Sequence, residues 1–427
     1  MNQRLIPTLH VRLLLLSLAV NLYLPAQPRG AHYDEARVPD YSLPPVLTSD
    51  DPADWPGRRR ELVQLFEEHV YGRVPGAADS VTATLLRSDT ALAGRAVMEQ
   101  YRVQLHVGQR QHPIDLLLYL PAHRPPPYPV VVAMNFYGNH AVRIDTNILL
   151  PTTWLPNSEE YGISNNRAAD ASRGARAFRW APELLVDRSY ALATFYRGDF
   201  DPDRAGHWED GVHPLFYTAG QTWPDSSEWG SIAAWAWGYS RITDHLLTDA
   251  RIDPERIIFQ GHSRLGKAAL WAGANDERAA VVVSNNSGCG GAALSRRGYG
   301  ETVSIINTSF PHWFNDRFPA YNDREDELPV DQHQLIALMA PRPVYVASAV
   351  DDRWADPRGE YLAAYHAGAA YRLLGLVALS SPELPPLNTP LYRAAVGYHL
   401  RSGGHDVRPY DWERFLDFAD YHLGGGQ

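Results

Sequence analysis

The segment best suited to chemistry is residues 256–270, RIIFQGHSRLGKAAL. An apolar run passes through Gly261 to Ser263, and a helix-forming stretch follows at once. Such a strand–turn–helix segment presents a serine hydroxyl above a sheet, where the next helix N-terminus favours developing negative charge. The spacing departs from G-x-S-x-G, because Leu265 takes the place of the second glycine and Gly266 comes one residue later. We predict that Ser263 is a nucleophile; the alternative is a serine that only caps a helix.

A serine hydroxyl needs a base to take its proton, and in folds with this turn the base follows late in the chain, after the acid. His405 fits that order. It lies in the glycine-flanked segment 401–406, RSGGHD, ahead of a helical stretch at 410–421. We predict that His405 is the general base on a mobile loop; the alternative is a surface histidine. The sequence has no H-E-x-x-H or comparable spacing, which disfavours a metallohydrolase and predicts no metal site.

The third group must be a carboxylate that orients the imidazole and stabilises its positive charge. The apolar run 344–347 is followed by SAVDDRWADP, residues 348–357. An acid directly after a late strand is usual in this architecture, and we predict Asp352. Asp351 and Asp356 stay open as alternatives, and any one of the three could merely cap the loop.

The elements around these residues predict an α/β fold. Residues 80–120 alternate with period two, which is typical of antiparallel strands at a sheet edge. Runs that are apolar on both faces predict buried parallel strands, and helical stretches lie between some of them. The runs are 128–135, 190–195, 256–259, 280–283 and 344–347, the crossover helices are 232–247, 267–274 and 361–370, and 54–71 should be a peripheral helix. We expect an α/β-hydrolase fold: a three-layer αβα sandwich around a mostly parallel sheet.

The N-terminal segment resembles an export signal. Two arginines precede an apolar stretch at 13–26, which is shorter than the about 20 residues that a membrane helix needs. We expect residues 1–31 to be a signal peptide cut between Gln27 and His32, and the protein to be periplasmic or extracellular. Residues 33–50 should form an extended surface arm, and 32–427 one catalytic domain. Cys289 is the only cysteine, so no intrachain disulfide can form.

The formal net charge of −10 argues against nucleic-acid or anionic-membrane partners, because such surfaces would repel the protein. Once the signal is removed we expect no membrane association. The composition suits a small-molecule or polysaccharide substrate, and we expect a monomer.

Several separate motifs resemble those of bacterial glucuronoyl esterases, carbohydrate esterase family 15. They are GHSRLGK (261–267), SGCGGAALSRRGYGE (287–301), WADP (354–357), LFEEHVYGRVP (65–75) and NFYGNH (135–140), and they span nearly all of the chain after the signal. The resemblance implies cleavage of the ester between glucuronic acid branches of xylan and lignin alcohols. It also implies a glucuronoyl-enzyme intermediate on Ser263 and no metal or organic cofactor.

The resemblance assigns further roles. Arg264 would correspond to the oxyanion-stabilising arginine. Positive charge is unfavourable at a helix N-terminus, so an arginine there already suggests that a negative charge binds beside it. Lys267, Glu301 and Trp354 would contact the sugar, since charged groups bind hydroxyls and an indole offers a flat wall. Each of the three could instead be structural.

One position departs from the family pattern. Many members carry the triad glutamate just before the SGCGG segment, where this chain has Asn286. Other members place the acid after the later strand, which agrees with Asp352. Asn286 could instead hydrogen-bond the histidine. Two other functions therefore stay open: a general or acetyl-xylan esterase of the same fold, and a carbohydrate-binding homologue that has lost catalysis.

Overall fold

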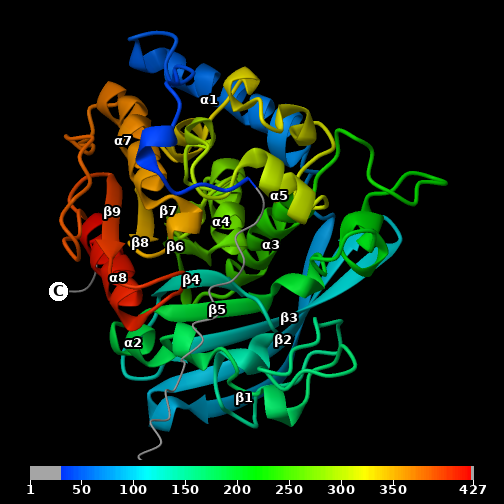
Figure 1. Ribbon diagram of the computed structural model, residues 1–427. Coiled ribbons are helices and arrows are strands. Elements are labelled where there is room, and N and C mark those ends of the chain that lie inside the picture. The colour runs from blue at the N-terminus through cyan, green and yellow to red at the C-terminus, as the bar shows by residue number, and fades with distance from the viewer. Residues whose placement is uncertain (1–29, 425–427) are drawn as a thin grey trace, which may run out of the picture.

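The computed structural model describes residues 30–424, and a single nine-stranded sheet runs through it (Figure 1). The strand order is β1-β2-β3-β5-β4-β6-β7-β8-β9. The strands are β1 Ser80–Ala91, β2 Ala96–Val107, β3 Arg110–Pro121, β4 Tyr128–Asn135, β5 Ala191–Tyr196, β6 Ile252–His262, β7 Ala279–Asn285, β8 Val344–Ala349 and β9 Val396–Arg401. Strands β1 to β3 pair antiparallel, as does β3 with β5, and the remaining pairs are parallel.

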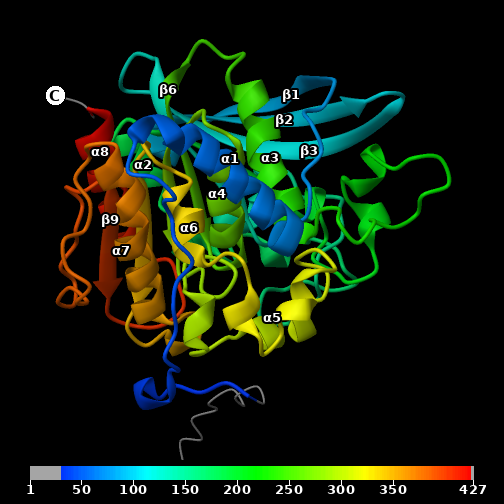
Figure 2. The same ribbon diagram turned by 90° about the horizontal axis from the view of Figure 1, so that it is seen from above.

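Helices cover both faces of the sheet, which confirms the predicted three-layer α/β fold (Figure 2). Along β4, Val130 and Val132 pack into one core cluster, whereas Val131 and Ala133 pack into the other. Successive side chains of a strand point to opposite faces, so a strand buried on both must be apolar throughout. The helices are α1 Trp55–Phe66, α2 Pro182–Asp187, α3 Ser231–Leu246, α4 Arg264–Asn275, α5 Val303–Ser309, α6 Gln332–Ala337, α7 Pro357–Leu373 and α8 Pro409–Leu423.

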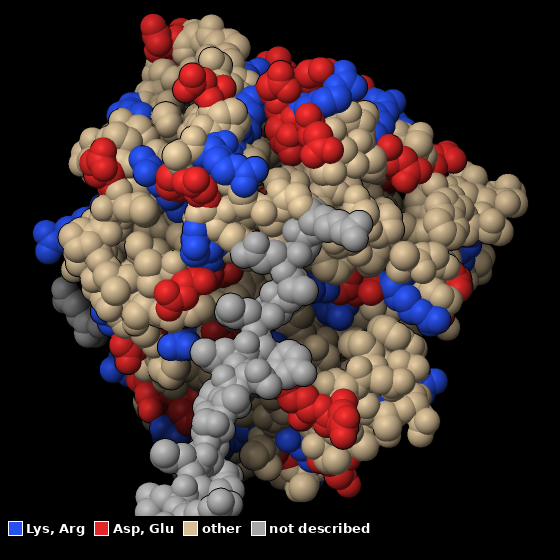
Figure 3. Space-filling model, in the orientation of Figure 1, with Lys and Arg blue, Asp and Glu red and all other residues tan. Residues whose placement is uncertain are grey.

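The two helical layers differ in size. Buried side chains of α1, α3, α4, α6 and α7 belong to the larger cluster. Those of α2 and α8 form the smaller one with the opposite face of the sheet. Within residues 30–424, no helix is both long enough and apolar enough to cross a bilayer. Positive and negative side chains are interspersed on the face drawn in Figure 3.

All five predicted parallel strands and the antiparallel edge are confirmed, but the sequence prediction missed β9. This strand contains His399 and Arg401, and both are fully buried or nearly so. They are tolerated because Asp411 of α8 accepts from Arg401 Nε at 2.8 Å and contacts His399 Nε2 at 2.9 Å. A search for apolar runs overlooks a strand whose buried polar groups find partners elsewhere in the chain.

The arm 33–50 lies along the surface as expected, with a short 3-10 turn at Glu35–Arg37. In Figure 2 the arm, in dark blue, begins at the end of the molecule toward which β9 points and runs back along the surface toward α1. The predicted signal peptide lies outside the described residues, apart from Gly30 and Ala31.

Candidate active site

The turn between β6 and α4 holds Ser263 in a strained conformation. Its φ of 59° and ψ of −129° fall outside the usual regions for a residue with a side chain. Gly261 makes the turn possible, because a Cβ there would lie 2.0 Å from the carbonyl oxygen of Leu265. The structure also explains why the second glycine of the motif is at position 266. A Cβ on Gly266 would lie 3.0 Å from the Cβ of Ser287, so a side chain at this position would be crowded.

Three side chains from distant parts of the chain meet at this turn. His405 Nε2 lies 2.9 Å from Ser263 Oγ, and His405 Nδ1 lies 2.6 Å from Asp352 Oδ2. With Nδ1–H donating to the carboxylate, Nε2 is left to accept the serine proton. The structure therefore brings Ser263, His405 and Asp352 into the geometry of a nucleophile, a base and an orienting acid.

The two rival acids lie elsewhere. Asp356 pairs with Arg297 Nε at 2.7 Å and caps α7. Asp351 is exposed, and its backbone N–H donates to the carbonyl of Gly403. Only Asp352 of the three contacts the histidine ring.

Asn286 contacts the acid and not the histidine. Its Nδ2 donates to Asp352 Oδ2 at 2.8 Å, the same oxygen that faces His405. The alternative in which Asn286 hydrogen-bonds the histidine is therefore wrong in this structure. The amide group supplies a second donor that orients the carboxylate.

The loop that carries His405 is anchored at several points. Arg401 donates to the carbonyls of Gly404 and Asp406, and Asn285 Nδ2 donates to the carbonyl of Asp406 at 2.9 Å. The ring of His262 packs against that of His405, with ring centroids 4.6 Å apart. Burial, together with neighbouring positive charge, lowers the pKa of His262 well below its ordinary value, so its ring stays neutral. These contacts hold the loop that the sequence predicts to be mobile.

The sequence prediction missed Asp203, a buried carboxylate that pairs with the residue after Ser263. It pairs with Arg264 and, at 3.0 Å, with Arg197 Nη1. His312 Nε2 at 3.0 Å and Trp313 Nε1 at 2.6 Å contact its other oxygen. Burial alone would raise the pKa of Asp203, but the two arginines and these hydrogen bonds hold it well below its usual range.

This pairing explains how a cation can lie at the N-terminus of α4. Arg264 and Arg197 share this one carboxylate. The Arg264 guanidinium also lies 4.6 Å from the ring centre of Trp313 and 5.3 Å from that of Phe310. The only sequence signal for Asp203 is the acidic repeat DFDPD at 199–203, which does not by itself indicate a partner.

The predicted sugar contacts lie on one side of the same cleft. Lys267 Nζ donates to the carbonyl of Ser287 at 2.5 Å and lies 3.9 Å from Glu301 Oε2. The backbone N–H of Glu301 donates to the carbonyl of Trp354 at 3.0 Å. Burial lowers the pKa of Lys267 and raises that of Glu301, so both charges lack full hydration and can gain from a polar ligand.

The cleft has a volume of about 320 Å³, within the range of small-ligand sites. It brings together all seven residues singled out in the sequence and adds Phe310 and Trp313. Its lining is Ser263, Arg264, Lys267, Asn286, Ser287, Gly288, Glu301, Phe310, Trp313, Asp352, Trp354, Ala355 and His405.

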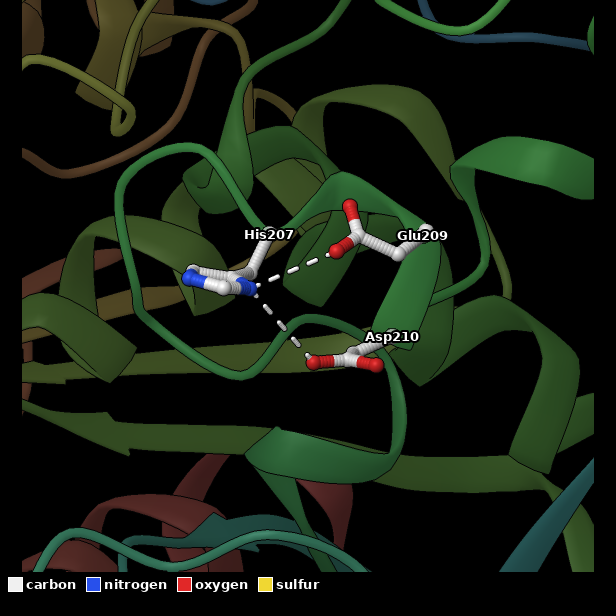
Figure 4. A group of neighbouring side chains, drawn as sticks. All are labelled: His207, Glu209 and Asp210. Carbon is white, nitrogen blue, oxygen red and sulfur yellow. Dashed lines mark ion pairs between the residues drawn. The ribbon is translucent and has the colours of Figure 1, made fainter.

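A separate group of possible metal ligands lies on the surface (Figure 4). His207 Nδ1 is 3.3 Å from Glu209 Oε1 and 3.9 Å from Asp210 Oδ2. The three side chains do not line the cleft, and both carboxylates are exposed. Exposed acidic groups of this kind are common without a metal.

Comparisons with known proteins agree with this geometry. The family description of fungal glucuronyl esterases matches residues 187–375. A carbohydrate esterase, MZ0003, from an unidentified prokaryote is 47% identical over 408 residues, which is 94% of each chain. This chain belongs to the glucuronoyl esterase family. As a member of carbohydrate esterase family 15, it is a carboxylic ester hydrolase with the α/β-hydrolase fold.

Solved structures of glucuronoyl esterases superpose over most of the chain. A promiscuous family 15 esterase from a marine bacterial metagenome is 46% identical, with a TM-score of 0.84 over 92% of this chain and all of its own. A glucuronoyl esterase from Solibacter usitatus is 41% identical, with a TM-score of 0.83 over 91% of this chain and all of its own.

Proposed function

We propose that this glucuronoyl esterase cleaves the ester between (4-O-methyl-)D-glucuronic acid of glucuronoxylan and a lignin alcohol. The observation that carries the proposal is the position of the Lys267–Glu301 pair and Trp354 in the same cleft as Ser263 and His405. An esterase for small acyl groups has no need of a buried charged pair beside its nucleophile. A uronate ring, with hydroxyls that both donate and accept, can use it.

The chemistry proceeds through an acyl-enzyme. Ser263 Oγ attacks the ester carbonyl as His405 Nε2 takes its proton, and Asp352 stabilises the imidazolium. His405 then returns this proton to the departing alcohol. Water then attacks the glucuronoyl-serine ester as His405 takes its proton, and His405 returns this proton to Ser263 Oγ. The carboxyl group of the glucuronic acid, still attached to its xylan, is freed and the serine hydroxyl is restored.

The tetrahedral oxyanion forms at the start of α4. The first backbone N–H groups of a helix have no acceptor within it, and here they belong to Arg264 and Leu265. The Arg264 side chain adds a full charge, which Asp203 holds in place. Preorganised donors of this kind contribute most when they are already oriented in the resting enzyme.

A general or acetyl-xylan esterase is the second candidate, and the relative described as promiscuous favours testing it. The third, a carbohydrate-binding homologue without catalysis, has little support, because the hydroxyl, imidazole and carboxylate are joined by short hydrogen bonds.

The test compares kcat/KM for benzyl glucuronate and for 4-nitrophenyl acetate in the wild type and in Glu301→Gln. We expect a strong preference for the glucuronate, and a loss of that preference in the variant through KM. Glu325→Gln is the matched control, because burial also raises the pKa of Glu325 but that residue does not line the cleft. Faster turnover of the acetyl ester by the wild type would favour the second candidate.

We further propose that residues 1–31 are an export signal, that 32–427 act as one catalytic domain, and that the mature enzyme works as a monomer in the periplasm or outside the cell. The apolar stretch 13–26 supports export. N-terminal sequencing of the protein recovered outside the cytoplasm tests it: a mature start between Gln27 and His32 is expected.

A further inference from the structure

We propose that His32 to Glu35, the start of the arm together with the residue before it, are positioning residues for the sugar-side wall of the cleft. They join two loops, 297–301 and 353–358, which carry Glu301 and Trp354. The inference rests on the proposed function, since it concerns affinity for the glucuronoyl group. None of the arm residues lines the cleft, so they act through the loops they hold.

The first connection is a backbone contact next to Glu301. The N–H of Gly300 donates to the carbonyl of His32 at 2.9 Å, while the N–H of Glu301 donates to the carbonyl of Trp354 at 3.0 Å. Gly300 has φ +67°, and a Cβ there would lie 2.6 Å from the carbonyl oxygens of Arg353 and Trp354. The arm and the two loops are thus in direct backbone contact.

The second connection is a cluster around Arg353. Its guanidinium donates to the carbonyl of Tyr33 and, at 3.0 Å, to the hydroxyl of Tyr299. It lies 5.0 Å from the ring centre of Tyr33 and 6.0 Å from that of Tyr299. The rings of His32 and Tyr33 pack edge-on against Tyr299. One arm segment therefore contacts a side chain from each loop.

The third connection is ionic. Glu35 accepts from Arg297 Nη2 at 2.8 Å and lies 3.7 Å from Arg358 Nη1. Arg297 also pairs with Asp356, so Glu35 extends an ion-pair network that spans both loops. Arg297 is almost fully buried, which makes this contact less screened than an ordinary surface pair.

These contacts matter because neither loop is held by a strand. In the first loop, residues 298–302 lie outside helices and strands. The second contains only the 3-10 turn Arg353–Ala355 before α7 begins at Pro357, so side-chain and inter-loop bonds help to place both loops. Hydrogen bonds to a sugar require their partners within a few tenths of an ångström. Loosening the loops would weaken sugar binding while leaving Ser263, His405 and Asp352 in place, because Asp352 is bonded to Ala349, Asn286 and His405 and none of these contacts involves the arm.

The experiment uses three variants of the chain beginning at Ala31: a truncation beginning at Val38, Tyr33→Ala and Glu35→Gln. We expect KM for benzyl glucuronate to rise at least about fivefold in the truncation, with smaller increases in the point variants, as expected for one or two lost hydrogen bonds. Turnover number for that substrate and kcat/KM for 4-nitrophenyl acetate should stay within about twofold of wild type.

Glu61→Gln is the matched control, because Glu61 is also a surface carboxylate paired with an arginine, Arg58 at 2.8 Å, but it lies in α1. An unchanged KM in the truncation, or an equal loss on both esters, would overturn the inference. If the truncated chain fails to fold, acetyl-ester turnover disappears and the two point variants decide. A wild type inactive on benzyl glucuronate would instead refute the proposed function.

Discussion

Replacement of the acid by its amide, Asp352→Asn, should reduce kcat/KM by about 10²–10³ and not by the roughly 10⁴ known for triads whose histidine takes the wrong tautomer. The difference comes from Asn286. Asp352 Oδ2 faces two donors, His405 Nδ1 at 2.6 Å and Asn286 Nδ2 at 2.8 Å. In Asp352→Asn, an NH₂ group at the position of Oδ2 would face two N–H donors and could accept from neither. The amide oxygen should therefore take that position and keep the proton on His405 Nδ1.

What remains lost is the negative charge opposite the imidazolium. Two unit charges about 4 Å apart interact by about 4 kcal/mol at an effective dielectric constant of 20. A hydrogen bond to a charged group also contributes about 1 kcal/mol more than a neutral one. These contributions overlap, and at about 1.4 kcal/mol per factor of ten, a loss of 3–4 kcal/mol gives the stated range.

The assay is steady-state hydrolysis of benzyl glucuronate in a cycle of Asp352→Asn, Asn286→Ala and the double variant. Asn286→Ala alone should cost less than about tenfold, because both carboxylate oxygens can still accept from the histidine. In the Asp352→Asn background, Asn286→Ala should lower kcat/KM by a factor at least about ten times larger than in the wild type. The reason is that the amide that replaces the Asp352 carboxylate is then free to turn. A loss below tenfold in Asp352→Asn would refute the assignment of the acid, and additivity would refute the role given to Asn286.

Three further outcomes follow from the site. Arg264→Gln should lower kcat about 10²–10³-fold with little change in KM, measured on benzyl glucuronate; a change in KM alone would contradict an oxyanion role. Asp203→Asn leaves two arginines without their counter-charge, so urea denaturation should show a loss of about 3–5 kcal/mol, and an unchanged midpoint would contradict it. Burial raises the pKa of Glu360 to about 8, so its contribution to stability is complete below its ordinary pKa of 4.5 and is lost as the pH rises to 8. The melting temperature of Glu360→Gln should therefore rise relative to that of the wild type between pH 5 and pH 8.5. A difference in melting temperature that does not change with pH would refute this.

The sequence predicts the parts of the site that follow from local pattern. The turn around Ser263, the loop of His405 and the acidic stretch after β8 each have a recognisable neighbourhood, and chain order limits their roles. Their catalytic roles stay predictions, although the structure places the three side chains in contact. The fold was predictable for a similar reason, because strands buried on both faces must be apolar throughout.

The missed features depend on long-range pairing. Asp203 is 61 positions from Arg264 in the chain, and no periodicity connects them. Strand β9 escapes because Asp411 satisfies its buried His399 and Arg401. The contact between Asn286 and Asp352 likewise spans 66 positions. The sequence around a polar residue does not indicate which distant group will form its hydrogen bond or ion pair.

The most direct test of the account is the release of benzyl alcohol from benzyl glucuronate by purified wild type and Ser263→Ala, measured side by side. We expect rapid release by the wild type and release at the uncatalysed rate by the variant, whose melting temperature should be close to that of the wild type. Substantial activity in a folded Ser263→Ala protein would show that this serine is not the nucleophile and would contradict the acyl-enzyme mechanism.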